Sequence, residues 1–367
     1  MSQPAEPTRT SRDRPLKWAG ILVILFAVLA GLGQASKVFL EIRDRDREAG
    51  ELQAAADRQR RAGDFPAAWA SLERAAAVVD RGGSIARLAG RSSDGRARLS
   101  IRTAQEDLAM AWLQNWQPPG QPPAPLPETL VPTLTAGAAA ASGARKADLL
   151  AHLGWEAALR GGPGGEDTSD AAPESFFRQA VEADPSNPYA HAHWGYWLAW
   201  QQKLGEASSR FDAALASGRA RPYVRAVQLA ALLLHTAPAS GTAYIAAVAD
   251  MIRNGEAVDA AVRDRVYALY AFGFEGEAAF AQLTAALPAA AQIALVRTLF
   301  IDAADRRPDR TAAAYAWLAR LQEAAGDQEG ALASWRSVLS SLPPEASGPL
   351  ADRARAAVAA ARPALLR

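Results

Sequence analysis

The chain has 367 residues, and its 40 Lys and Arg against 39 Asp and Glu give a net charge of +1, so charge provides no reason to expect nucleic acid as a partner. Half of the residues are hydrophobic while only 7% are aromatic, and the abundance of alanine, the best helix former, predicts an all-α fold. The absence of cysteine excludes thiol catalysis, thiolate metal sites and disulfides.

A long apolar segment lies near the N-terminus. Residues 18–36 are uncharged and mostly apolar, and a helix of this length crosses a bilayer at about 1.5 Å per residue. Basic residues in 1–17 favour a cytoplasmic tail before the span. We therefore predict a single-pass protein of a bacterial inner membrane, with its remaining residues in the periplasm. Two alternatives stay open: a signal peptide cleaved after the small residues 33–35, and a reversed topology with a cytosolic scaffold.

A first helical region is expected at residues 37–116. Within 47–80, small and apolar residues at helical spacing stand on both sides of Gly63-Asp64, which predicts two helices joined by a turn.

Residues 117–145 differ in composition from their surroundings. Seven prolines fall between Gln117 and Leu134, and an Ala/Gly/Ser stretch follows to Gly143. Proline at this density favours an extended, semi-rigid linker. A proline-rich ligand for another protein is the functional alternative.

The remaining chain, 146–367, contains an internal repeat. Phe177 and Ala180 recur 34 residues later as Phe211 and Ala214, and Trp194-Gly195 stands between them. This order of large residue, glycine and small alanine resembles the tetratricopeptide repeat family, whose period is about 34 residues.

The resemblance implies an α-solenoid of antiparallel helix pairs, in which glycine and alanine lie where paired helices cross. It also implies that Pro185, after Asp184, begins a helix. The units at 47–80 and 309–345 fit the same frame, so the region 37–116 is also expected to be tetratricopeptide-like. The other expected elements are a first helix around Leu150–Gly154 paired with the helix of Phe177 across a loop at 161–170, unplaced helices at 219–305, and a capping helix at 348–362.

The sequence contains no recognisable catalytic motif, so we predict neither an enzyme nor a metal or cofactor. His152 and His193 each precede a repeat glycine by two residues, so stacked repeats would bring them close together. No third metal ligand can be named for them. The glycine-rich loop lacks a phosphate-loop lysine and the alternating ligand spacing of a calcium loop.

In the resembling family, partners bind along the concave face formed by the first helix of each pair. Positions carried over to this face are predicted to bind a partner: Trp155, Tyr189, His193, Tyr196, Trp200 and Arg320. Exposed aromatic side chains with a polar group suit a peptide or a sugar. The alternative is that this aromatic run is mostly buried.

These features predict an inner-membrane scaffold that holds other envelope proteins, with envelope or polysaccharide assembly as an example of such a role. The alternative is a periplasmic peptide- or carbohydrate-binding module that uses the aromatic groove. The oligomeric state does not follow from the sequence.

Overall fold

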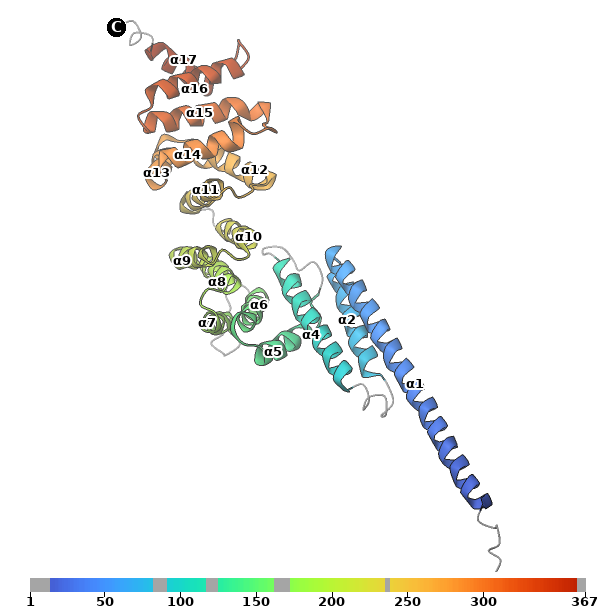
Figure 1. Ribbon diagram of the computed structural model, residues 1–367. Helices are drawn as coiled ribbons and strands as arrows, with labels where there is room; N and C mark the ends of the chain where they lie inside the picture. The colour runs from blue at the N-terminus through green and yellow to red at the C-terminus, as the bar shows by residue number, and fades with distance from the viewer. Residues whose placement is uncertain (1–13, 82–90, 117–124, 162–171, 235–237, 362–367) are drawn as a thin grey trace, which may run out of the picture. The chain divides into compact units, whose positions relative to one another are not determined.

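The computed structural model describes residues 14–81, 91–116, 125–161, 172–234 and 238–361. Its elements are all helices, so the all-α prediction is confirmed for the part of the chain that the structure describes (Figure 1). The chain divides into two units, Met1–Trp194 and Gly195–Arg367. Each unit is described separately below.

The helices of the first unit, with α8 running across the division, are α1 (Arg14–Arg61), α2 (Phe65–Asp80), α4 (Arg91–Gln114), α5 (Leu130–Ala140), α6 (Gly143–Gly161), α7 (Pro173–Ala183) and α8 (Pro188–Trp200). Those of the second unit are α9 (Leu204–Ala216), α10 (Arg221–Leu232), α11 (Pro238–Arg253), α12 (Ala260–Ala268), the π-helix η1 (Leu269–Gly273), α13 (Glu277–Ala286), α14 (Ala289–Val296), the π-helix η2 (Arg297–Ile301), α15 (Pro308–Ala324), α16 (Gln328–Ser341) and α17 (Pro349–Ala361).

Helix α1 is a single helix of 48 residues. Its C-terminal part packs along α2 (Figure 1). The turn between them uses Gly63 at φ +79°, a backbone conformation that glycine adopts without steric cost. Asp64 then caps α2, because its carboxylate accepts a hydrogen bond of 3.1 Å from the N–H of Ala67. The predicted helix pair at 47–80 is therefore present.

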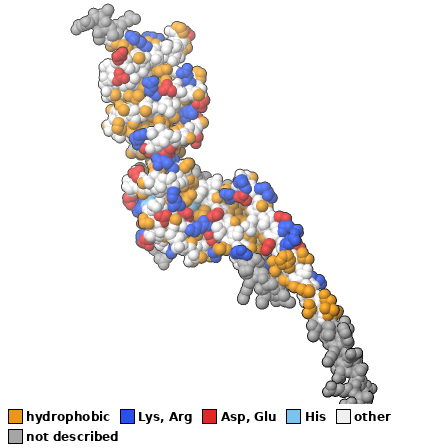
Figure 2. Space-filling model, in the orientation of Figure 1, with side chains coloured by type: hydrophobic (Ala, Val, Ile, Leu, Met, Phe, Trp, Pro, Cys, Tyr) orange, Lys and Arg blue, Asp and Glu red, His pale blue; other side chains and the backbone are white. Residues whose placement is uncertain are grey.

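The N-terminal part of α1 carries exposed hydrophobic side chains, among them Leu25, Phe26, Leu29 and Leu32. They form an apolar surface beside the grey N-terminal residues in Figure 2. Among the described residues, no single helix has the length and hydropathy of a membrane span. One bent pair, α13 with α14–η2 at 107°, passes that test by length and composition only.

Several predicted features lie outside the described residues. They are residues 1–13 of the tail, residues 117–124 of the linker and residues 162–170 of the loop. In the span 18–36, the side chains of residues 18–24, 27 and 30 also lie outside the description.

The linker prediction for 117–145 is wrong for residues 130–140, which form α5. The only proline of this helix, Pro132, lies in its first turn, where a missing N–H breaks no intrahelical bond. Leu130 and Leu134 are fully buried, and α5 packs against α4 and α6. The alanine-rich stretch therefore builds part of the core.

Helices α6 and α7 form the predicted pair. Gly154 lies where they cross: a Cβ at this position would come within 2.6 Å of the Phe177 ring. The same relation recurs in the second unit, where a Cβ at Gly195 would lie 3.1 Å from Phe211. Both phenylalanines are buried, so each glycine allows an aromatic ring of the paired helix to approach its backbone.

The predicted helix start at Pro185 is wrong. Asp184 ends α7, Pro185 lies in the following turn, and α8 begins at Pro188. The buried Asn187 makes this start: its side-chain oxygen accepts a 2.9 Å hydrogen bond from the N–H of Ala190.

At the C-terminal end, α15, α16 and α17 lie in consecutive layers (Figure 1). Gly326 adopts φ +80° in the turn, and Asp327 caps α16 through the N–H of Gly330 at 2.9 Å. Ala351 and Ala354 bury one face of α17 against the preceding pair. The expected pair at 309–345 and the expected helix at 348–362 are both present.

The region 219–305 is helical but irregular. Its helices are short, and two of them continue into the π-helical turns η1 and η2. Tyr270 of this region stacks on Trp317 of α15 at 5.2 Å. π-helical turns of this kind are rare and interrupt the regular α-helical period.

Candidate functional site

The residues predicted to bind a partner are more buried than an open groove requires. Trp155 and Tyr196 are each 1% exposed and His193 is 0% exposed. Tyr189 and Trp200 are half-buried. In this structure the first three side chains belong to the core, so the prediction that they present an exposed aromatic surface is wrong.

In the first unit, the predicted proximity of His152 and His193 is confirmed. Their ring centres are 5.1 Å apart. The His193 ring stacks on Trp155 at 4.9 Å, and Tyr189 lies 5.1 Å from His152. The indole N–H of Trp155 donates to the carbonyl of Leu113 at 3.1 Å, so its polar group is used within the fold.

Hydrogen bonds hold the His152 ring in a single neutral tautomer. Its Nδ1 lies 2.6 Å from the carbonyl oxygen of Asp148, and its Nε2 lies 2.9 Å from the side-chain nitrogen of Gln114. A carbonyl can only accept, so Nδ1 carries the proton and Nε2 accepts from the Gln114 amide. The Asp148 carboxylate in turn accepts from Asn187 at 2.6 Å. This network joins α4 and α6 to Asn187, the residue that caps α8.

Burial controls the charge of this cluster. Burial lowers the pKa of His152 to about 4, and the nearby positive charge of Arg145 acts in the same direction. Burial and the neighbouring His152 hold the pKa of His193 well below its ordinary value. Both rings are therefore neutral at pH 7. No group of three His, Cys, Asp or Glu side chains among the described residues could hold a metal ion.

In the second unit, Tyr196 contacts Trp200 edge to face at 6.2 Å. Arg320 lies elsewhere in that unit: its guanidinium covers the Phe280 ring at 3.7 Å and donates to Glu277 at 3.2 Å. Arg320 is 9% exposed, so it connects α15 to α13 rather than presenting a free charge.

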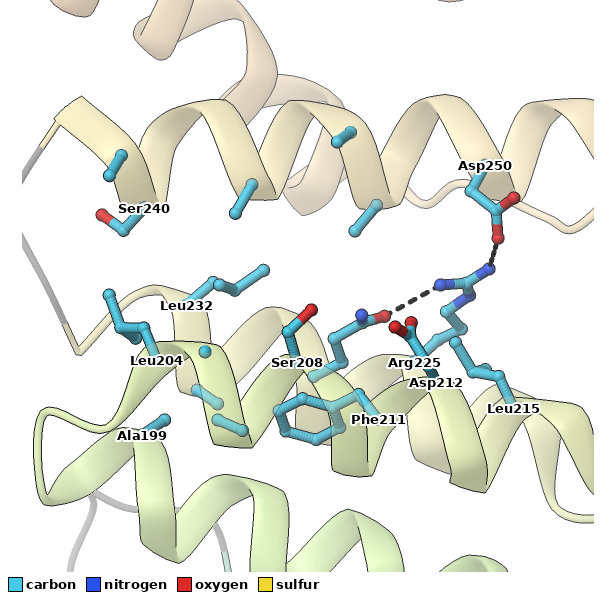
Figure 3. A pocket seen from close by; sticks show the side chains of 18 of the residues that line it. Ala199, Leu204, Ser208, Phe211, Asp212, Leu215, Arg225, Leu232, Ser240 and Asp250 are labelled. Carbon is cyan, nitrogen blue, oxygen red and sulfur yellow. Dashed lines mark hydrogen bonds and ion pairs between the residues drawn. The ribbon is translucent and has the colours of Figure 1, made fainter. Parts of the chain in front are cut away.

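A groove of about 570 Å³ opens between α9, α10 and α11 of the second unit (Figure 3). We call it the α9–α11 groove. Its volume falls within the range of about 300–1,000 Å³ typical of binding sites. It is lined by Ala199, Leu204, Gly205, Ala207, Ser208, Phe211, Asp212, Leu215, Arg225, Gln228, Ala231, Leu232, Ala239, Ser240, Ala243, Ala246, Ala247, Asp250 and Arg253.

Small side chains create this space. On α11 the lining positions 239, 243, 246, 247 and 250 follow the spacing of one helical face, and the first four are alanines. Leu204 and Leu232 extend from the opposite helices toward this face (Figure 3). The groove therefore has walls on which an apolar side chain of a ligand could pack.

One end of the α9–α11 groove is ionic. Arg225 is 3% exposed and donates to Asp250, to Glu256 at 3.2 Å and to Gln228 at 2.8 Å. Burial raises the pKa of Asp250, but hydrogen bonds from Arg225 and Arg253 outweigh it and leave the pKa below its ordinary value. The buried arginine is thus fixed and neutralised, while the apolar end stays open.

The repeat pattern of the sequence does not predict this groove. The small-residue face of α11 was a usable signal, but it says nothing about the facing helices. Of these, α9 has a place in the repeat frame through Phe211 and Ala214, but α10 does not.

The chain matches no protein-family model, and comparisons with curated proteins and with solved structures likewise find no match.

Proposed function

We propose that this protein is a single-pass inner-membrane adaptor with a tetratricopeptide-like α-solenoid, and that its α9–α11 groove binds an apolar segment of another envelope protein. The groove is the observation that carries the proposal. Leu204 and Leu232, which are half-buried, line it together with a row of alanines. An uncovered apolar surface beside fixed polar groups is typical of protein-binding sites.

The architecture supports a scaffold. Helices α6–α7 and α15–α16 pack as pairs, and stacked helix pairs build the extended binding surfaces of repeat proteins. The apolar N-terminal part of α1 supports the proposed anchor. The alternative, an aromatic groove for a peptide or a carbohydrate, loses support because Trp155, His193 and Tyr196 are buried.

Site-specific photo-crosslinking in the native membrane tests the proposal. A photoreactive amino acid at Ser208, which is exposed and lines the groove, should form an adduct with a specific envelope protein. The matched control is Ala216, which is exposed on the same helix but does not line the groove.

A second variant separates groove occupancy from general proximity. Ala243→Trp places a large side chain in the groove and should abolish the Ser208 adduct without changing membrane association. If the adduct forms equally from Ala216, or persists in Ala243→Trp, the partner binds another surface and the groove assignment fails.

A further inference from the structure

A second cavity in the same unit is surrounded by arginines. It has a volume of about 130 Å³ and lies between α12, η2 and the start of α15. We call it the arginine cavity. Its lining residues are Ala260, Arg263, Asp264, Leu299, Phe300, Asp305, Arg306, Arg307 and Arg310. Four arginines against two aspartates give the lining a formal charge of +2.

The aspartates are already occupied by two of the arginines. Arg263 pairs with Asp305 at 2.6 Å, and Arg310 pairs with Asp264. Arg310 also lies over the Tyr267 ring at 4.3 Å, so it is held in place on both sides. These pairs fix two guanidinium groups at the cavity wall.

Among the described residues, neither of the other two arginines pairs with an aspartate that lines the cavity. Arg306 donates to the carbonyl of Ile301 at 3.4 Å and has no carboxylate partner among the described residues. Arg307 pairs with Asp309 at 3.0 Å, a residue that does not line the cavity. The Nε of Arg263 is buried and has no hydrogen-bond partner. Since this atom has no exposed surface, the exposed donors at the cavity are those of Arg306 and Arg307.

We propose that the arginine cavity binds a small phosphate-type oxyanion. The guanidinium fork matches the oxygens of a phosphate group in pairs. Leu299 and Phe300 form the apolar side of the cavity, where a lower dielectric strengthens such contacts. The volume accommodates the phosphate group alone, so the source is a free phosphate or the headgroup of a phospholipid. This site is separate from the α9–α11 groove and does not depend on the adaptor proposal.

Calorimetric titration of the full-length protein in detergent with inorganic phosphate, at constant chloride, tests the site. Arg306→Ala should raise the Kd for phosphate about tenfold, the effect of losing one charge-assisted contact. Arg306→Lys, which keeps the charge but not the fork, should raise it less. Arg306 is exposed, so neither change removes core packing.

Arg336→Ala is the matched control, because Arg336 is an exposed arginine of the same unit outside the cavity. It should leave the Kd for phosphate unchanged. If the wild-type protein does not bind phosphate, or if Arg306→Ala and Arg336→Ala bind it equally, the proposal is overturned.

A second experiment distinguishes free phosphate from a phospholipid headgroup as the bound group. The titration is repeated in phosphatidylcholine nanodiscs with and without phosphatidic acid. A higher apparent Kd for phosphate in the presence of phosphatidic acid supports the site and assigns it to the lipid headgroup. An unchanged Kd supports the site and assigns it to a free phosphate.

Discussion

At the scale of single residues, the packing of the helix pairs depends on positions where no side chain fits. Gly154 faces both Phe177 and Phe176 of the paired helix, and a Cβ there would lie 2.6 Å and 3.1 Å from their nearest atoms. By contrast, Gly50 of α1 has nothing within 4 Å of its Cβ position. Close packing therefore requires a glycine at position 154, whereas position 50 has room for a side chain.

Gly154→Ala should lower the free energy of unfolding by about 1–3 kcal/mol, the usual cost of overpacking a core. Gly50→Ala should raise it by about 0.5–1 kcal/mol, because alanine is the better helix former. Urea unfolding followed by circular dichroism measures both. Equal effects of the two changes would show that the α6–α7 crossing tolerates a methyl group.

The histidine cluster is the second feature decided at this scale. In the folded chain the pKa of His152 is depressed to about 4, whereas an unfolded histidine titrates near 6.5. At a pH between these two pKa values, His152 binds a proton in the unfolded state but not in the folded state. The contribution of neutral His152 to the free energy of unfolding is therefore fully present above pH 6.5 and is lost as the pH falls toward 4.

Lowering the pH from 7 to 5 should accordingly cost the wild-type protein about 2 kcal/mol through His152. In His152→Gln this part of the loss should disappear, because glutamine does not titrate. Urea unfolding at both pH values checks the difference. The same loss in both proteins would mean that other groups dominate the pH dependence.

At the scale of elements, α5 shows how composition can mislead. A proline-rich stretch precedes it, yet residues 130–140 are helical and contribute Leu134, which is fully buried, to the first unit. Prolines before a helix or in its first turn do not interrupt its hydrogen bonds.

Leu134→Ala should therefore lower the free energy of unfolding by about 2–5 kcal/mol, as expected when a buried leucine leaves a cavity. Leu99, on α4 of the same unit, is 54% exposed, and Leu99→Ala should change stability by no more than about 0.5 kcal/mol. Thermal unfolding compares the pair directly. A solvated spacer at 130–140 would make the two effects equally small.

At the scale of the whole molecule, the proposal depends on how the chain meets the membrane. Exposed apolar residues continue along α1 beyond the predicted span, to Phe39 and Leu40. Charged residues begin at Lys37. The proposed span 18–36 and the surface after it can therefore be tested separately.

The variant Leu25→Arg/Leu29→Arg should leave membranes on alkaline carbonate extraction, since each arginine near the centre of a span costs about 2.5–3.5 kcal/mol. The control, Phe39→Arg/Leu40→Arg, changes two equally exposed residues outside the span and should remain in the membrane pellet. Immunoblotting of pellet and supernatant checks both. Extraction of the wild-type protein, or retention of both variants, would contradict an anchor at 18–36.

The sequence by itself determined the helical composition, the pairs around Gly63 and Gly326, and the match of Gly154 and Gly195 to buried phenylalanines. These features depend on short-range spacing, which a helix converts directly into position. Tertiary structure decided the rest: the burial of Trp155 and Tyr196, the incorporation of α5 into the core, and both cavities of the second unit. Each of these depends on which faces of distant helices meet, and local periodicity does not contain that information.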